Sequence, residues 1–224
     1  MATQVLINGD IDTMVALLEE SELFDTVEKV NQPIGSNTLS SIKATKNSNN
    51  MIIYWGFKVA NSTTECYGFV DHAGIAEGTY FTNYTSAESA KAYRPESAYK
   101  CSGGIIIVCK YGRVLLTKNN AGDTVVCFGN GTVADTNILE NAMGSICALA
   151  ETDTDMPLNS FMYNSTGIGN QTFLMPLCSQ SSFGVSSYTN TAALMLLAQS
   201  RSLGNISYNG KTYFTDGYFA VEDE

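Results

Sequence analysis

The sequence predicts an α+β, β-rich fold that combines antiparallel sheets with two or three short helices and a C-terminal β-meander. Only 15% of the residues are charged, and Ser, Thr, Asn and Gly take the place of the Lys, Arg and Glu of a typical helical surface. Three strand-like runs follow one another within residues 104–128. The last 20 residues alternate short aromatic runs with Asn-Gly and Asp-Gly turns.

We divide the chain into three parts. Residues 1–35 form an N-terminal strand and helix segment, in which a helical apolar stripe begins at Ile11 and a second amphipathic segment covers residues 23–30. Residues 36–50 are polar and predict a linker or a long exposed loop. Residues 51–224 form the β-rich main domain.

Within the main domain, MIIYWGFKVA and CYGFVDH predict a first pair of strands. GIIIVCK, RVLLTK and TVVCF predict three further strands. Because GIIIVC is apolar at consecutive positions, both of its faces should be buried, as in a central strand. Residues 136–150 and 190–202 predict helices, each with a polar N-cap candidate, and residues 172–177 read as a strand.

The chain is acidic: 22 Asp and Glu against 12 Lys and Arg give a formal net charge of -10. Such a surface repels phosphate backbones and anionic lipids, so we expect neither a nucleic-acid nor a membrane partner. No apolar run approaches the roughly 18–20 residues that span a bilayer. The start, MATQVLINGD, lacks the basic and apolar regions of a secretory signal, so we expect synthesis in a host cytoplasm without a signal peptide.

The cysteines predict free thiols rather than disulfides. The chain is long and lacks an export signal, and two of its cysteines lie inside apolar strand-like runs, where free Cys acts as a small buried hydrophobe. The six cysteines are Cys66, Cys101, Cys109, Cys127, Cys147 and Cys178.

The sharpest catalytic candidate is the run Asp10-Ile11-Asp12-Thr13. It resembles the first motif of haloacid-dehalogenase-like phosphohydrolases. That resemblance implies Asp10 as nucleophile, Asp12 as general acid/base, and a Mg²⁺ ion held with their help. The preceding strand is short and is interrupted by Asn8-Gly9, and no Lys lies in a recognisable motif. The competing interpretation is that Asp10 or Asp12 caps the first helix, and we favour it.

Other motifs are incomplete, so we expect no catalytic residue, no metal site and no cofactor. The single histidine, His72, stands about 20 Å from Cys66 if both lie on one strand. Glu151, Asp153 and Asp155 alternate like the opening of a calcium loop, but Met156 and Pro157 follow where a Gly turn is required.

The aromatic residues of the tail are the candidate functional surface. Short strands cannot turn both members of each adjacent aromatic pair inward, and exposed Tyr is common at protein interfaces. The interface candidates are Tyr208, Tyr213, Phe214, Tyr218 and Phe219.

In its acidic, Ser/Thr/Asn-rich composition and in the closing meander NGKTYFTDGYF, the chain resembles structural proteins of bacteriophage or phage-tail-like particles. That resemblance implies a non-enzymatic virion subunit of a tail, baseplate, fibre or head decoration. Its partners would be copies of itself, in a homo-oligomer, and other particle proteins. Two alternatives stay open: a carbohydrate- or cell-surface-binding module, which would report sugar through Trp55 fluorescence, and the Mg-dependent phosphohydrolase.

Overall fold

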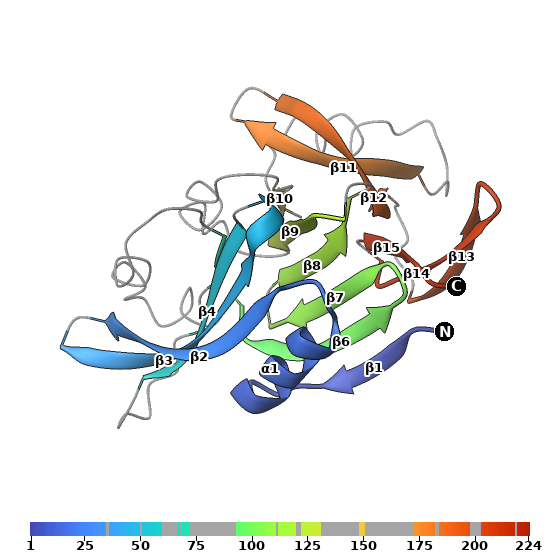
Figure 1. Cartoon of the computed structure of the whole chain (residues 1–224). Helices are drawn as coiled ribbons and strands as arrows, with labels where there is room; N and C mark the ends of the chain where they lie inside the picture. Colours follow the sequence, from blue (N-terminus) through green and yellow to red (C-terminus); the bar gives the residue numbers. More distant parts are fainter. Residues whose placement is uncertain are drawn as a thin grey trace.

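In the computed structural model, the described part of the chain forms three β-sheets, the α-helix α1 (Ile11–Glu20) and one turn of 3-10 helix, η1 (Asn47–Asn49) (Figure 1). The described residues are 1–34, 36–49, 51–59, 67, 69–71, 93–110, 112–119, 122–130, 148–150, 173–181, 184–197, 203–217 and 219–224. Within them, the β-rich, antiparallel character predicted from the sequence is confirmed.

The sheets differ in size, and we name them by their position. The central sheet has six strands in the order β1 (Thr3–Leu6), β6 (Pro95–Cys101), β7 (Gly104–Cys109), β8 (Gly112–Lys118), β9 (Thr124–Asn130) and β10 (Ala148–Ala150). The N-terminal sheet has four, β2 (Thr26–Ile34), β3 (Asn37–Lys46), β4 (Met51–Val59) and β5 (Phe69–Asp71). The C-terminal sheet has five, in the order β11 (Phe173–Ser181), β12 (Gly184–Leu197), β15 (Phe219–Glu222), β14 (Lys211–Thr215) and β13 (Gly204–Tyr208).

The central strand β7 is buried on both faces, as its unbroken apolar run predicts. Side chains alternate between the faces of a strand, so neighbouring residues serve different cores. Ile105 and Ile107 belong to a first core cluster, and Ile106 between them belongs to a second. All three are at most 1% exposed.

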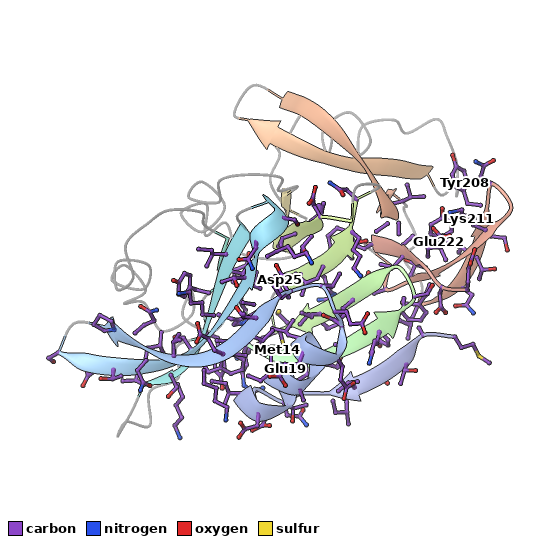
Figure 2. All side chains as sticks on the ribbon, in the orientation of Figure 1. Met14, Glu19, Asp25, Tyr208, Lys211 and Glu222 are labelled. Atoms are coloured by element: carbon purple, nitrogen blue, oxygen red, sulfur yellow. The ribbon has the colours of Figure 1, made fainter. Side chains whose placement is uncertain are left out.

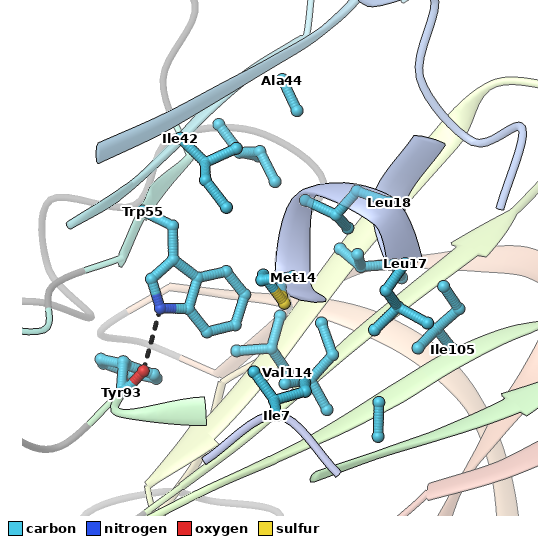
Figure 3. Packing of buried hydrophobic residues seen from close by; sticks show 14 of the residues in the cluster. Ile7, Met14, Leu17, Leu18, Ile42, Ala44, Trp55, Tyr93, Ile105 and Val114 are labelled. Atoms are coloured by element: carbon cyan, nitrogen blue, oxygen red, sulfur yellow. Dashed lines mark hydrogen bonds between the residues drawn. The ribbon is translucent and has the colours of Figure 1, made fainter. Parts of the chain in front are cut away.

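The first core lies between the central sheet, helix α1 and the N-terminal sheet. Helix α1 contributes Met14, Leu17 and Leu18, which follow one another at the helical spacing that the sequence shows. Trp55 of β4 lies in the same cluster, and its indole N–H donates to the carbonyl oxygen of Tyr93 at 2.9 Å (Figure 3). That hydrogen bond satisfies the one polar atom that the Trp side chain brings into the core.

The second core lies between the opposite face of the central sheet and the C-terminal sheet. Phe214 of β14 and Phe219 and Val221 of β15 pack there with Ile106 and Leu115. The C-terminal meander therefore supplies the apolar cover that the second face of the central sheet requires.

Polar contacts also join these two sheets. Arg113 of β8 donates through Nε to Asp216 Oδ2 at 2.8 Å, and the Asp216 side chain is only 2% exposed. Asp216 Oδ1 accepts from the backbone N–H of Phe219 at 3.0 Å, so this carboxylate also shapes the β14–β15 turn. At the other end of β15, the N–H of Gly103 donates to the carbonyl oxygen of Glu222 at 2.8 Å.

Several sequence predictions are confirmed. Strands β7, β8 and β9 form the predicted antiparallel run, and β4 pairs with β5 as the predicted first pair. The tail is the predicted meander, with β13 and β14 joined by a two-residue turn whose Asn209 and Gly210 have φ of 51° and 80°. Positive φ at both turn residues is the requirement of a type I′ hairpin, and Asn-Gly meets it.

The predicted linker at residues 36–50 is wrong. Residues 37–46 form β3, which lies between β2 and β4 and pairs with both. Its few apolar residues are sufficient because a strand needs an apolar residue only at the positions that face a core. Leu39, Ile42 and Ala44 are each 0% exposed. Residues 1–35 are likewise divided between two sheets, since β1 pairs with β6 whereas β2 pairs with β3.

The prediction of two or three short helices is also corrected, because α1 is the only α-helix among the described residues. The segment predicted as helix at 190–202 continues strand β12 as far as Leu197, and Ala148–Ala150 at the end of the other predicted helix form β10. The second amphipathic segment becomes β2 from Thr26. An apolar run such as AALMLL suits a helix or a buried strand, and pairing of β12 with both β11 and β15 decides for the strand.

Replacing Arg113 with Met should lower the free energy of unfolding by about 3 kcal/mol, because it removes the guanidinium that pairs with the buried Asp216 carboxylate. The double variant Arg113→Met/Asp216→Asn should recover about 1–2 kcal/mol, since no buried charge then remains uncompensated. Urea denaturation measures both values.

The matched control is Lys100→Met, which breaks the exposed pair with Glu20, whose side chain is 66% exposed. It should change stability by less than about 0.5 kcal/mol. If Arg113→Met is equally mild, the Arg113–Asp216 pair does not hold the two sheets together.

Candidate functional site

Asp10 is the N-cap of helix α1. Its Oδ2 accepts from the backbone N–H of Thr13 at 2.8 Å and from the Thr13 hydroxyl at 2.6 Å. Asp10 has the extended backbone of a cap, with φ -83° and ψ 122°. Both hydrogen bonds lower the pKa of the Asp10 carboxyl, and the bond from the Thr13 hydroxyl has the larger effect. The capping interpretation of Asp10 is therefore confirmed.

Asp12 lies one position into the helix and forms an ion pair with Lys29 of β2. Both side chains are exposed, at 69% for Asp12 and 51% for Lys29. Asp10 and Asp12 therefore stand at a helix start that follows β1, an edge strand that pairs antiparallel with β6. Among the described residues, no group of three or more His, Cys, Asp or Glu side chains is arranged to hold a metal ion.

The aromatic residues of the tail, proposed from the sequence as an interface, differ in how exposed they are. Tyr208 is 47% exposed, but Tyr213, Phe214 and Phe219 are 7%, 8% and 0% exposed. Three of the five candidates are thus buried within this chain, and Tyr218 lies outside the described residues. Phe214 and Phe219 fill the second core, whereas Tyr213 points to the opposite face of the sheet.

Tyr213 is covered by its neighbours on that opposite face. The ring of Tyr208 packs edge-on against the Tyr213 ring, with centroids 6.5 Å apart. Lys211 Nζ contacts Glu222 Oε1 at 2.6 Å beside them, and Figure 2 shows Tyr208, Lys211 and Glu222 near one another on the outer hairpin. Burial, followed by the nearby Glu222 carboxylate, raises the pKa of Tyr213. This arrangement is why two adjacent aromatic residues of β14 can both be shielded.

Strand β13 forms a free edge of the tail among the described residues. Strand β13 is the last strand of the C-terminal sheet, and its Asn205, Ser207 and Tyr208 are exposed. The N–H of Asp223 donates to the carbonyl oxygen of Thr212 at 3.0 Å, so Thr212 directs its backbone groups away from β13. Ser207 lies opposite Thr212, and its own N–H and C=O therefore point out of the sheet.

A second free edge belongs to β1, the first strand of the central sheet. Leu6 on β1 is 66% exposed. Neither β1 nor β13 contains a charged residue or a proline, the usual protection of an edge against pairing with another chain. By contrast, the edge strand β2 carries Glu28, Lys29 and Pro33.

Sequence reasoning found the meander, but three of its five interface candidates are buried within this chain. It ranked positions by aromatic character, whereas the feature left exposed is the backbone of β13 with Tyr208 at its end. The signal was present as GNISY, a five-residue strand without charge or proline beside an Asn-Gly turn. What the sequence could not show is that β13 lies at the edge of its sheet.

Trp55 cannot serve as an exposed sugar platform, because it is 0% exposed in the first core. Cys101 and Cys109 carry free thiols. Burial, with a smaller effect of the Asp223 carboxylate, raises the pKa of Cys101 to about 12, and burial also raises the pKa of Cys109. High thiol pKa values leave little thiolate for nucleophilic attack. His72, Cys66 and the acidic run at 151–155 lie outside the described residues.

Comparisons with protein-family models, with curated proteins and with solved structures find no match to this chain. No helix in the described ranges combines the length and the apolar content that a membrane crossing needs.

Replacing Asp10 with Ala should lower the thermal midpoint by about 2–4 °C, whereas Asp10→Asn should leave it nearly unchanged, because Asn also caps helices. Since the folded-state pKa of Asp10 is lowered, its contribution is fully present above its ordinary pKa of 3.8 and is lost as the pH falls through the lower folded value. Thermal melts at pH 7 and in acid measure both effects. Mg²⁺-dependent turnover of a phosphomonoester that Asp10→Asn abolishes would instead support the phosphohydrolase.

Proposed function

We propose that this chain is a non-enzymatic structural subunit that acts by self-association and packing. The observation that carries the proposal is the pair of free, uncharged edges on β1 and β13. Unprotected edges favour pairing with another chain, and proteins that act as monomers usually block them. A subunit that works inside an assembly gains from leaving them open.

The charged groups of the described residues support the same proposal. Asp10 caps a helix, and Asp216 joins two sheets through Arg113. Asp25 accepts from the backbone N–H of Asn47 at 2.7 Å and from Lys46 Nζ at 3.0 Å, and these bonds lower the pKa of the Asp25 carboxyl. These carboxylates stabilise the fold, and none of them is grouped as catalysis would require.

The particle that we propose is a bacteriophage virion or a phage-tail-like particle. Support comes from the acidic, Ser/Thr/Asn-rich composition and the closing aromatic meander, which resemble particle proteins. A role in a tail, baseplate, fibre or head decoration follows from that resemblance. Partners would be further copies of this chain and other particle proteins. The net charge of -10 argues against contact with packaged nucleic acid.

The purified chain should form homo-oligomers whose mass rises with concentration. Sedimentation velocity and light scattering across a concentration series measure that mass. The double variant Leu6→Lys/Tyr208→Lys should shift the chain toward monomer, because it places a charge on each free edge. The matched control, Ala16→Lys on the exposed face of helix α1, should leave the oligomer unchanged. A chain that stays monomeric at its highest soluble concentration would overturn the proposal.

A further inference from the structure

We infer that two copies of the chain pair antiparallel through strand β13, with a two-fold axis at Ile206. This inference rests on the proposed self-association and names the surface that carries it. The two C-terminal sheets would then join into one continuous sheet across the axis. Figure 1 shows the β13–β14 hairpin at the periphery of the molecule, where a second copy has access.

The hairpin turn fixes which backbone groups are available. In a two-residue hairpin the closing residues, here Tyr208 and Lys211, form a hydrogen-bonded pair, and such pairs alternate with non-bonded pairs along the strands. Ile206 is therefore bonded to Tyr213 within the sheet, whereas Asn205 and Ser207 direct their N–H and C=O outward. The bond that Thr212 accepts from the N–H of Asp223, the residue after β15, independently supports this alternation.

This spacing is self-complementary. With the axis at Ile206, Asn205 of one copy lies opposite Ser207 of the other, and each such pair exchanges both of its N–H···O bonds. Ile206 lies opposite its own copy as a non-bonded pair, which needs no free backbone group. Residues on either side of the axis thus match without a shift in register, the condition for a symmetric dimer.

The side chains fit the same pairing. Gly204 and Tyr208 lie at equal distances along the strand from Ile206, so Tyr208 of one copy lies opposite Gly204 of the other. A side-chain carbon built at Gly204 would meet no atom within 4 Å, and the Tyr208 side chain is 47% exposed. Open space at the glycine can accept the aromatic ring, a pairing known to stabilise glycine in sheets.

The local charge at β13 permits a second copy as the partner. The chain carries a net charge of -10, so two copies repel unless they meet where carboxylates are absent or compensated. Strand β13 has no charged residue, and the closest acidic side chain on the adjoining strands, Glu222, is compensated by Lys211. A single edge contact buries little surface, so the dimer should form in a concentration-dependent way and be reinforced inside a larger assembly.

A cysteine introduced at the axis tests the register directly. Non-bonded antiparallel partners have Cα atoms about 4.5 Å apart, within the range that a disulfide spans. Ile206→Cys should therefore give a disulfide-linked dimer under mild oxidation, seen on a non-reducing gel. Tyr208→Cys is the matched control and should not link, because the two copies of that position lie on opposite sides of the axis. The unaltered chain controls for its native cysteines.

Paired charges test the same contact without oxidation. Asn205→Asp/Ser207→Asp places like charges opposite each other and should raise the dimer dissociation constant at least about tenfold. Asn205→Lys/Ser207→Asp introduces as many charges, but each lysine then faces an aspartate of the other copy, so the dimer should persist. Both positions are exposed, and circular dichroism should show an unchanged fold.

The outcomes separate this inference from the proposed function. An oligomer in which Ile206→Cys fails to link and the two charge variants behave alike would overturn pairing through β13, while self-association would stand. A persistent monomer would overturn both. Linkage of Tyr208→Cys instead of Ile206→Cys would place the contact in another register and would equally overturn the inference.

Discussion

The fold depends on the burial of the middle strands of the central sheet on both faces. Strand β7 presents Ile105, Ile106 and Ile107 in succession, and the pleat sends them to opposite sides. Each side therefore needs its own apolar cover. Burial stabilises the fold by roughly 25 cal/mol for every Å² of apolar surface removed from water. Helix α1 and the N-terminal sheet cover one face, and the C-terminal meander covers the other. The ends of the chain are thus recruited to a core built from its middle.

This constraint also determines which tail residues remain accessible. Strands β14 and β15 must turn Phe214, Phe219 and Val221 inward to complete the second core. Strand β13 lies one position further out, and its half-buried Ile206 is the only residue of GNISY with a large aliphatic side chain. What β13 offers to a partner is therefore mainly backbone, and backbone pairing gives affinity whose specificity comes from the few side chains at its ends.

Sequence reasoning succeeded where local signals were unambiguous. An apolar run between two turns identified β7 as central, and Asn209-Gly210 required a hairpin because both residues must adopt positive φ. Asp10 before a helical stripe predicted the cap that the structure shows. In each case a single physical requirement, burial or a backbone dihedral angle, leaves few alternatives.

It failed where pairing partners decide the structure. The segment around Ile42 looks like a linker until β2 and β4 bind its backbone on both sides. The AALMLL run looks helical until β11 and β15 do the same for β12. The proposed assembly edge shares this difficulty, because whether a strand lies at the margin of a sheet depends on how all the other strands pair. Secondary-structure propensity is a property of one segment, whereas a sheet depends on pairing between segments that lie far apart in the sequence.

Two free edges in different sheets have a consequence for assembly. A two-fold contact through β13 is closed, because each copy gives and receives the same strand. Growth beyond a dimer then needs a second, independent contact, and β1 offers one at the margin of the central sheet with Leu6 exposed. With both contacts, the proposed subunit would connect dimers into a ring or an extended array, as the proposed particle of many identical copies requires.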